Sequence, residues 1–125
     1  MFEVSVEETF AAGHALRGYR GKCENTHGHN YRVRITLAGE NLDDTGLLVD
    51  FKEIKGALNG VIERLDHQFL NELEPFRQAN PSAENIARYF YREVGRLVHA
   101  STQDRVRIRR VKLWETDTSA ATYFE

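Results

Sequence analysis

Two histidines flank a glycine in the stretch CENTHGHNYRVRITL, which covers residues 23–37. His27 and His29 share parity with Tyr31, and alternate residues of a strand point to the same side of a sheet. If a strand begins at His27, both imidazoles can therefore reach one metal ion. We expect the third ligand to be His14, in the segment AAGHAL. Three neutral imidazoles with one open position are typical of a catalytic zinc site, whereas a closed structural site usually takes several cysteines.

The other interpretation of these histidines is a set of surface side chains that are solvated by water. A His-Gly-His sequence alone does not exclude it, but three of the five histidines lie where they can converge, which favours a metal site. His99 is expected at the end of a helix, where an imidazolium suits the helix dipole, and is interpreted as a surface residue.

The only cysteine, Cys23, lies four residues before His27. A metal ion or a protonated imidazole nearby would favour its thiolate, which could accept a proton or act as a nucleophile. A free cysteine is more often a small buried hydrophobe, but the flanking sequence RGKCEN is typical of an exposed loop. Asp66 and His67 could form a carboxylate-oriented imidazole for acid-base chemistry, or could be polar residues at the end of a helix.

The composition limits the class of protein. The chain has 125 residues, of which 41% are hydrophobic and 29% charged, and we expect one globular domain over residues 1–125. A net charge of -2 offers no basic surface for nucleic acid or an anionic membrane. No apolar run is long enough to span a bilayer, and the first residues lack a signal-peptide pattern. A single cysteine cannot form an internal disulfide, so a reducing, cytoplasmic compartment is expected.

Apolar residues that alternate with polar ones predict strands near residues 2–7 and 31–37. The segment AAGHALRGYRGK between them is expected to be a loop. Apolar residues at helical spacing predict a first helix that Asp50 caps. A second helix is predicted from NPS, with Asn80 as its cap and Pro81 in the first helical position.

Two more strands are predicted near residues 105–115 and 119–124. In the strand near residues 105–115, the apolar residues before Arg109 alternate out of phase with those after Arg110. A bulge near these two arginines would restore the alternation. The order β-β-α-α-β-β favours the α+β class, with an antiparallel four-stranded sheet and both helices on one face. Such a sheet has open edges, which other copies of the chain could cover.

Five motifs follow one order along nearly the whole chain: a histidine in a glycine-flanked segment, C-x-x-x-H-G-H, LDH, NPSAEN and ETDTSAATY. Together they resemble the 6-pyruvoyl-tetrahydropterin synthase family, most closely its bacterial 6-carboxytetrahydropterin synthase branch. The resemblance implies the tunnelling fold. In that fold the sheets of several subunits join into a barrel, typically as a hexamer of two stacked rings of three, and the active sites lie between subunits.

The resemblance also implies a role for each matching residue. The implied ligands of a Zn²⁺ ion are His14, His27 and His29. The implied general base is Cys23, and the implied acid-base or relay pair is Asp66 and His67.

The glutamate that anchors the amino-pyrimidine edge of the pterin corresponds to Glu115, and in some descriptions it also belongs to the proton relay. A carboxylate can accept two parallel hydrogen bonds from such an edge. Relatives often have threonine and serine at the start of the second helix. Here the hydroxyl is kept at Ser82, the implied substrate contact, and lost at Ala83.

The implied substrate is 7,8-dihydroneopterin triphosphate. Zinc would act on the substrate side chain as a Lewis acid, Cys23 would remove a proton, and His67 with Asp66 would return one. The implied products are 6-carboxy-5,6,7,8-tetrahydropterin, triphosphate and acetaldehyde, on the route to queuosine and 7-deazaguanine. Three basic residues are near enough in sequence to contact the triphosphate: Arg17, Arg20 and Lys22.

Glu24 directly follows Cys23, so the stretch also reads E-x-x-H-G-H. A related subgroup uses that glutamate as the base and forms 6-hydroxymethyl-7,8-dihydropterin for folate. The chain could therefore be a carboxy-branch enzyme with an incidental glutamate, which we prefer, a 6-pyruvoyl or folate-branch enzyme, or bifunctional. In other classes, a non-catalytic zinc- or pterin-binding module would need neither Cys23 nor His67, and a thiol hydrolase would lack a recognised local signature.

Overall fold

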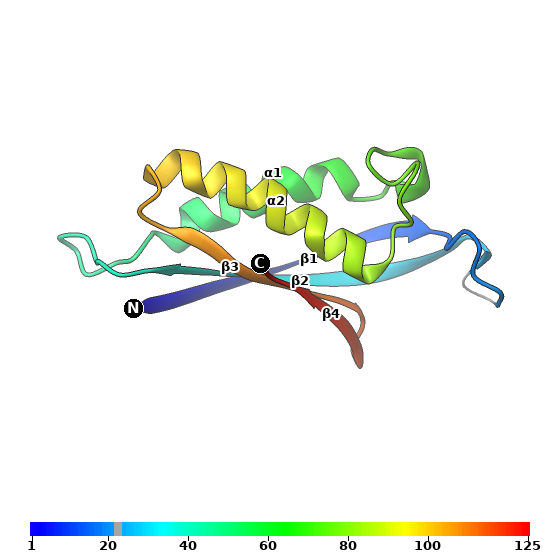
Figure 1. The fold of residues 1–125 in the computed structure, drawn as a ribbon, viewed down its shortest axis with the longest axis horizontal. Coiled ribbons are helices and arrows are strands. Elements are labelled where there is room, and N and C mark those ends of the chain that lie inside the picture. Colours follow the sequence, from blue (N-terminus) through cyan, green and yellow to red (C-terminus); the bar gives the residue numbers. More distant parts are fainter. Residues whose placement is uncertain (22–23) are drawn as a thin grey trace.

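The computed structural model describes residues 1–21 and 24–125. Within these ranges the elements are β1 (Phe2–His14), β2 (His27–Gly39), α1 (Phe51–Leu65), the short 3-10 helix η2 (Leu70–Glu72), α2 (Ala83–Thr102), β3 (Arg107–Thr116) and β4 (Ser119–Tyr123). Figure 1 shows α1 and α2 together on one side of the sheet. The predicted α+β class and the β-β-α-α-β-β order are confirmed.

The sheet of the described residues has the strand order β1-β2-β3-β4, and all its neighbouring strands are antiparallel. β1 and β2 pair without interruption along their whole length. The register of β3 against β2 shifts where Thr36 pairs with Arg110 and Leu37 pairs with Ile108. Arg109 is the additional residue at that shift, so the predicted bulge is confirmed.

The first strand extends beyond the residues that were predicted for it. Residues 11–14 were expected to lie in a loop, because the segment AAGHALRGYRGK is rich in glycine and arginine. They instead pair with residues 27–30 of β2. On the other edge, the Gly13 N–H donates to the Gln68 carbonyl at 3.0 Å and the His67 N–H donates to the Ala11 carbonyl at 2.6 Å. Pairing on both edges overrides the local propensity and places His14 at the end of β1.

The core lies between the sheet and the two helices. β2 and β3 bury alternate apolar residues on this face, among them Val33, Ile35, Leu37, Val111 and Leu113. The helices supply the facing side chains, among them Ile54, Leu58, Val61, Ile86, Phe90 and Val94. Asp50 caps α1 as predicted, because its carboxylate accepts from the Lys52 N–H at 2.8 Å. No helix within the described ranges is both long enough and apolar enough to cross a bilayer.

α2 begins later than predicted, and a different residue caps it. The cap is Ser82, whose Oγ accepts from the Asn85 N–H at 3.2 Å, so Pro81 precedes the helix. Asn80, the predicted cap, accepts from the Arg17 N–H at 3.0 Å instead. The Asn80 side chain, which the local sequence assigned to the helix cap, is therefore held by a residue 63 positions away. The same contact ties the chain after β1 to the start of α2.

Candidate metal centre

Three histidine rings meet on the helix-facing side of the sheet. His14 and His27 are cross-strand partners, and His29 lies on the same face as His27 because strand side chains alternate. The centroids of the three rings are 4.5 to 5.0 Å apart. One ligand nitrogen from each ring lies within 4.8 Å of the others, so the group could hold a metal ion. The structure thus brings together the three residues that the sequence singled out.

Backbone carbonyls determine the tautomers of two of these rings. His14 Nδ1 lies 2.7 Å from the Pro81 carbonyl oxygen, and His27 Nδ1 lies 2.7 Å from the Asn25 carbonyl oxygen. A carbonyl can only accept, so each Nδ1 carries the proton and each neutral ring has its lone pair on Nε2. The two Nε2 atoms are 2.9 Å apart. Two lone pairs at that distance repel unless a cation or a proton lies with them. Carbonyl partners of this kind orient histidines that bind metals.

The third ring has a buried nitrogen that also fits a cation. His29 Nε2 has no hydrogen-bond partner among the described residues. Its nearest acid is Glu115, whose Oε1 is 3.5 Å away but not aligned for a hydrogen bond, and lies 3.2 Å from His14 Nε2. Burial lowers the pKa of His29, against the raising effect of the Glu115 charge. The neutral ring is the form that binds metals. The lone pairs, the unpaired nitrogen and the adjacent carboxylate together fit a divalent cation.

An open cavity of about 540 Å³ lies beside this cluster, and both His29 and His67 line it. Its remaining walls come from the ends of β1 and β2 and from the chain after α1, namely residues 11–13, 26, 28, 30, 68 and 69. The structure therefore places the predicted relay histidine and one predicted metal ligand around the same space.

Asp66 and His67 form a pair at the edge of β1. Asp66 Oδ1 accepts from the Ala11 N–H at 3.0 Å and lies 3.1 Å from His67 Nδ1. These two hydrogen bonds hold the pKa of Asp66 below its usual range, so it is a carboxylate. His67 has a φ of 59°, which is uncommon for a residue other than glycine, and its side chain is 81% exposed. The backbone therefore holds Asp66 in place, while the His67 side chain is accessible to a ligand.

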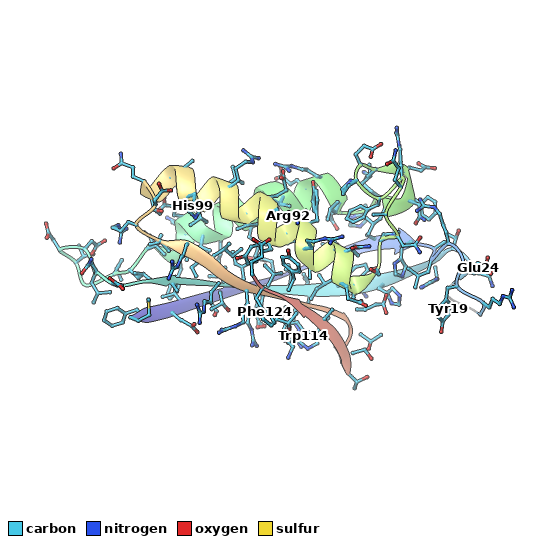
Figure 2. The ribbon with its side chains drawn as sticks, in the orientation of Figure 1. Tyr19, Glu24, Arg92, His99, Trp114 and Phe124 are labelled. Atoms are coloured by element: carbon cyan, nitrogen blue, oxygen red, sulfur yellow. The ribbon has the colours of Figure 1, made fainter. Side chains whose placement is uncertain are left out.

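The predicted bases lie in the chain between β1 and β2. Cys23, the predicted general base, lies outside the described residues, and so does Lys22. Glu24 is exposed, and Figure 2 shows it at the same end of the molecule as Tyr19.

Arg17, one of the three basic residues predicted near the triphosphate, has a structural role in this fold. Its guanidinium donates to the Phe76 carbonyl at 2.7 Å and to the Asn71 carbonyl at 3.2 Å. These hydrogen bonds hold the chain after β1 against the chain around η2. Arg20 is exposed.

Ser82 lies at the start of α2 and His99 lies in its last turn. The Ser82 hydroxyl accepts from the Asn85 N–H in the cap of α2, next to the Pro81 carbonyl that binds His14. His99 lies on α2, as Figure 2 shows, with Nδ1 2.6 Å from Asp104 Oδ1. It is exposed, as expected for a surface residue.

Sequence reasoning used Tyr31 only to set the parity of the strand and overlooked its position. Its ring is fully buried and lies edge-on to His14 and His29, with centroid distances of 6.0 and 5.5 Å. Burial, and then the Glu115 charge, raise the pKa of Tyr31. The sequence could have indicated this position, because a tyrosine among the buried residues of a strand normally needs a hydrogen-bond partner for its hydroxyl.

Comparisons with known proteins find relatives along nearly the whole chain. A family model described as 6-pyruvoyl tetrahydropterin synthase matches residues 3–125. The 6-carboxy-5,6,7,8-tetrahydropterin synthase of Haemophilus influenzae is 33% identical over 100% of both chains. The Bacillus subtilis protein of the same name is 34% identical over 98% of this chain and 84% of its own. The solved structure of Caenorhabditis elegans 6-pyruvoyl tetrahydropterin synthase has a TM-score of 0.85 at 26% identity, covering 100% of this chain and 97% of that chain.

Proposed function

Since the chain belongs to the 6-pyruvoyl tetrahydropterin synthase family, we propose that it is a zinc-dependent lyase of the carboxy branch. Its substrate is 7,8-dihydroneopterin triphosphate, and its products are 6-carboxy-5,6,7,8-tetrahydropterin, triphosphate and acetaldehyde. The names of the two bacterial relatives support this branch, because their likeness covers nearly all of this chain. The reaction serves queuosine and 7-deazaguanine biosynthesis in the cytoplasm.

The three-imidazole cluster is the observation that carries this proposal. Zinc suits it, because zinc binds three histidine nitrogens at catalytic sites and keeps a fourth position for water or substrate. Held by His14, His27 and His29, a zinc ion would supply Lewis-acid polarisation of an oxygen on the substrate side chain. The carbonyl partners of His14 and His27 present Nε2 to the ion and keep both rings from rotating.

Glu115 is proposed to bind the pterin ring. Its carboxylate is partly exposed, at 29%, and lies beside the histidines. It can accept two parallel hydrogen bonds from the amino group and ring N–H of an amino-pyrimidine. This contact would orient the pterin so that its side chain points to the metal centre.

Proton transfer is assigned to Cys23 and to the Asp66–His67 pair. Asp66 orients the His67 ring through Nδ1, which leaves Nε2 free to exchange a proton with the substrate. The carboxylate itself is fixed by the Ala11 N–H. Cys23 is proposed as the base from its place in the sequence, four residues before His27, where a nearby cation would favour the thiolate. Ser82 is a proposed substrate contact at the start of α2.

We also propose a hexamer of two stacked rings of three. β1 and β4 are the outer strands of the described sheet, and open strand edges are usually covered. A second subunit beside the exposed His67 would close the cavity around the substrate.

The test is incubation of the zinc-loaded protein with 7,8-dihydroneopterin triphosphate and identification of the product by mass spectrometry. We expect 6-carboxytetrahydropterin, its loss after chelation, and its loss in Cys23→Ala but not in Glu24→Ala. Full carboxypterin formation by Cys23→Ala would refute the assignment of the base. A 6-hydroxymethyl product that is lost only in Glu24→Ala would assign the folate-type cleavage instead.

A further inference from the structure

The Tyr31 hydroxyl is a buried polar group that finds no hydrogen-bond partner within the part of the chain that the structure describes. The side chain is fully buried, and its ring stacks on Phe10 with centroids 5.0 Å apart. A phenylalanine would make the same ring contacts without removing a hydroxyl from water. The buried hydroxyl is therefore unfavourable for folding in this state. We expect it to have a hydrogen-bond partner in another state of the site.

Glu115 is the group placed to be that partner. Arg32 of β2 pairs with Trp114 of β3, so the next residues, Tyr31 and Glu115, lie at adjacent positions of the two strands. Both face the helices, and side chains at such positions are within reach of one another. In this structure, however, Glu115 Oε1 is turned toward His14 and His29, at 3.2 and 3.5 Å. The carboxylate and the hydroxyl are thus neighbours that do not yet interact.

We propose that Tyr31 is a positioning residue for Glu115, to which its hydroxyl donates a hydrogen bond when the carboxylate turns from the imidazoles and binds the pterin. This inference rests on the proposed function, in which Glu115 binds the amino-pyrimidine edge. A carboxylate has about four lone-pair sites, so it can accept from Tyr31 and from two pterin N–H groups together. The hydrogen bond holds the plane of the carboxylate in the bound state and gives the buried Tyr31 hydroxyl a partner there, so it favours binding of the pterin.

The experiment measures binding of 7,8-dihydroneopterin to the zinc-loaded wild type, Tyr31→Phe, Glu115→Gln and the double variant by calorimetry. We expect Tyr31→Phe to weaken binding about tenfold, as for the loss of one hydrogen bond to a charged acceptor. In the Glu115→Gln background, the same change should have little further effect. Tyr89→Phe is the matched control, because it removes a hydroxyl that accepts from Arg64 on the helix layer, and its affinity should equal that of the wild type.

Stability separates positioning from packing. Metal-free Tyr31→Phe should resist urea at least as well as the wild type, because it no longer buries an unpaired hydroxyl. Unchanged pterin binding by Tyr31→Phe would overturn the inference, and so would an equal loss of affinity in the wild-type and Glu115→Gln backgrounds, which would mean that Tyr31 acts directly on the ligand. Failure of the wild type to bind 7,8-dihydroneopterin would overturn the pterin contact of Glu115 and this role together, whereas the lyase activity is tested separately by product formation from the triphosphate.

Discussion

His14 and His27 face each other across the β1–β2 ladder with their Nε2 atoms 2.9 Å apart. Each ring is turned this way by a carbonyl on its other nitrogen, 2.7 Å away in both cases. The Pro81 carbonyl belongs to the chain before α2 and the Asn25 carbonyl to the chain before β2. The two imidazoles are therefore oriented by the fold before any ligand arrives, which is what a metal site needs to bind without rearranging.

Zinc should stabilise the protein, and the histidines should be required for it. Free zinc at about 100 times its Kd would stabilise the folded state by about 2.7 kcal/mol, or about 10 °C in Tm for a domain of this size. The shift should vanish in His14→Ala and His27→Ala and persist in His99→Ala, as followed by differential scanning calorimetry. A full shift in His27→Ala would show that the ion binds elsewhere.

The Asp66 carboxylate should contribute to stability in a pH-dependent way. Its pKa in the folded protein is depressed by the Ala11 N–H and by His67. Its contribution is therefore complete above the pKa of the unfolded chain, about 3.9, and is lost as the pH falls through the lower folded value. Urea unfolding should show Asp66→Ala less stable than the wild type at pH 7, with the gap closing at acidic pH. Asp44→Ala, in the loop after β2, is the control. A gap independent of pH would contradict this account.

The cap of α2 gives a third prediction. Ser82→Ala removes the acceptor of the Asn85 N–H and should lower the free energy of unfolding by about 1 kcal/mol. Ser82→Asp should restore stability, since aspartate caps helices equally well. Equal stability of all three proteins would show that the cap contributes nothing. An increase in KM for the stable Ser82→Asp variant would support the proposed substrate contact.

Two helix glycines should respond to alanine in opposite directions. A Cβ at Gly95 would lie 2.8 Å from Ile108 Cγ2 of β3, whereas a Cβ at Gly60 of α1 would meet no atom within 4 Å. Gly95→Ala should therefore destabilise the protein by about 1–3 kcal/mol through overpacking. Gly60→Ala should stabilise it by about 0.5–1 kcal/mol through helix propensity. Urea unfolding compares the two, and a stabilised Gly95→Ala would show that β3 can move away from α2.

The sequence by itself determined the order of the elements and the face on which the helices lie. Strand and helix periods report which side of a local segment is buried, so the parity of His27 with His29 and the bulge at Arg109 could both be predicted. The same reasoning ended β1 too early, because residues 11–13 carry no strand pattern of their own. Only hydrogen bonds on both edges, from β2 and from residues 67 and 68, make them a strand.

The tertiary structure alone decided how the site is assembled. The carbonyl that orients His14 comes from Pro81, 67 residues away, and Glu115 reaches the histidines from β3. Ser82 caps α2 in place of Asn80, because the Asn80 side chain accepts a hydrogen bond from Arg17, 63 residues away in the chain. Periodicity describes one segment at a time, whereas each of these partners depends on the register and packing of segments far apart in the chain.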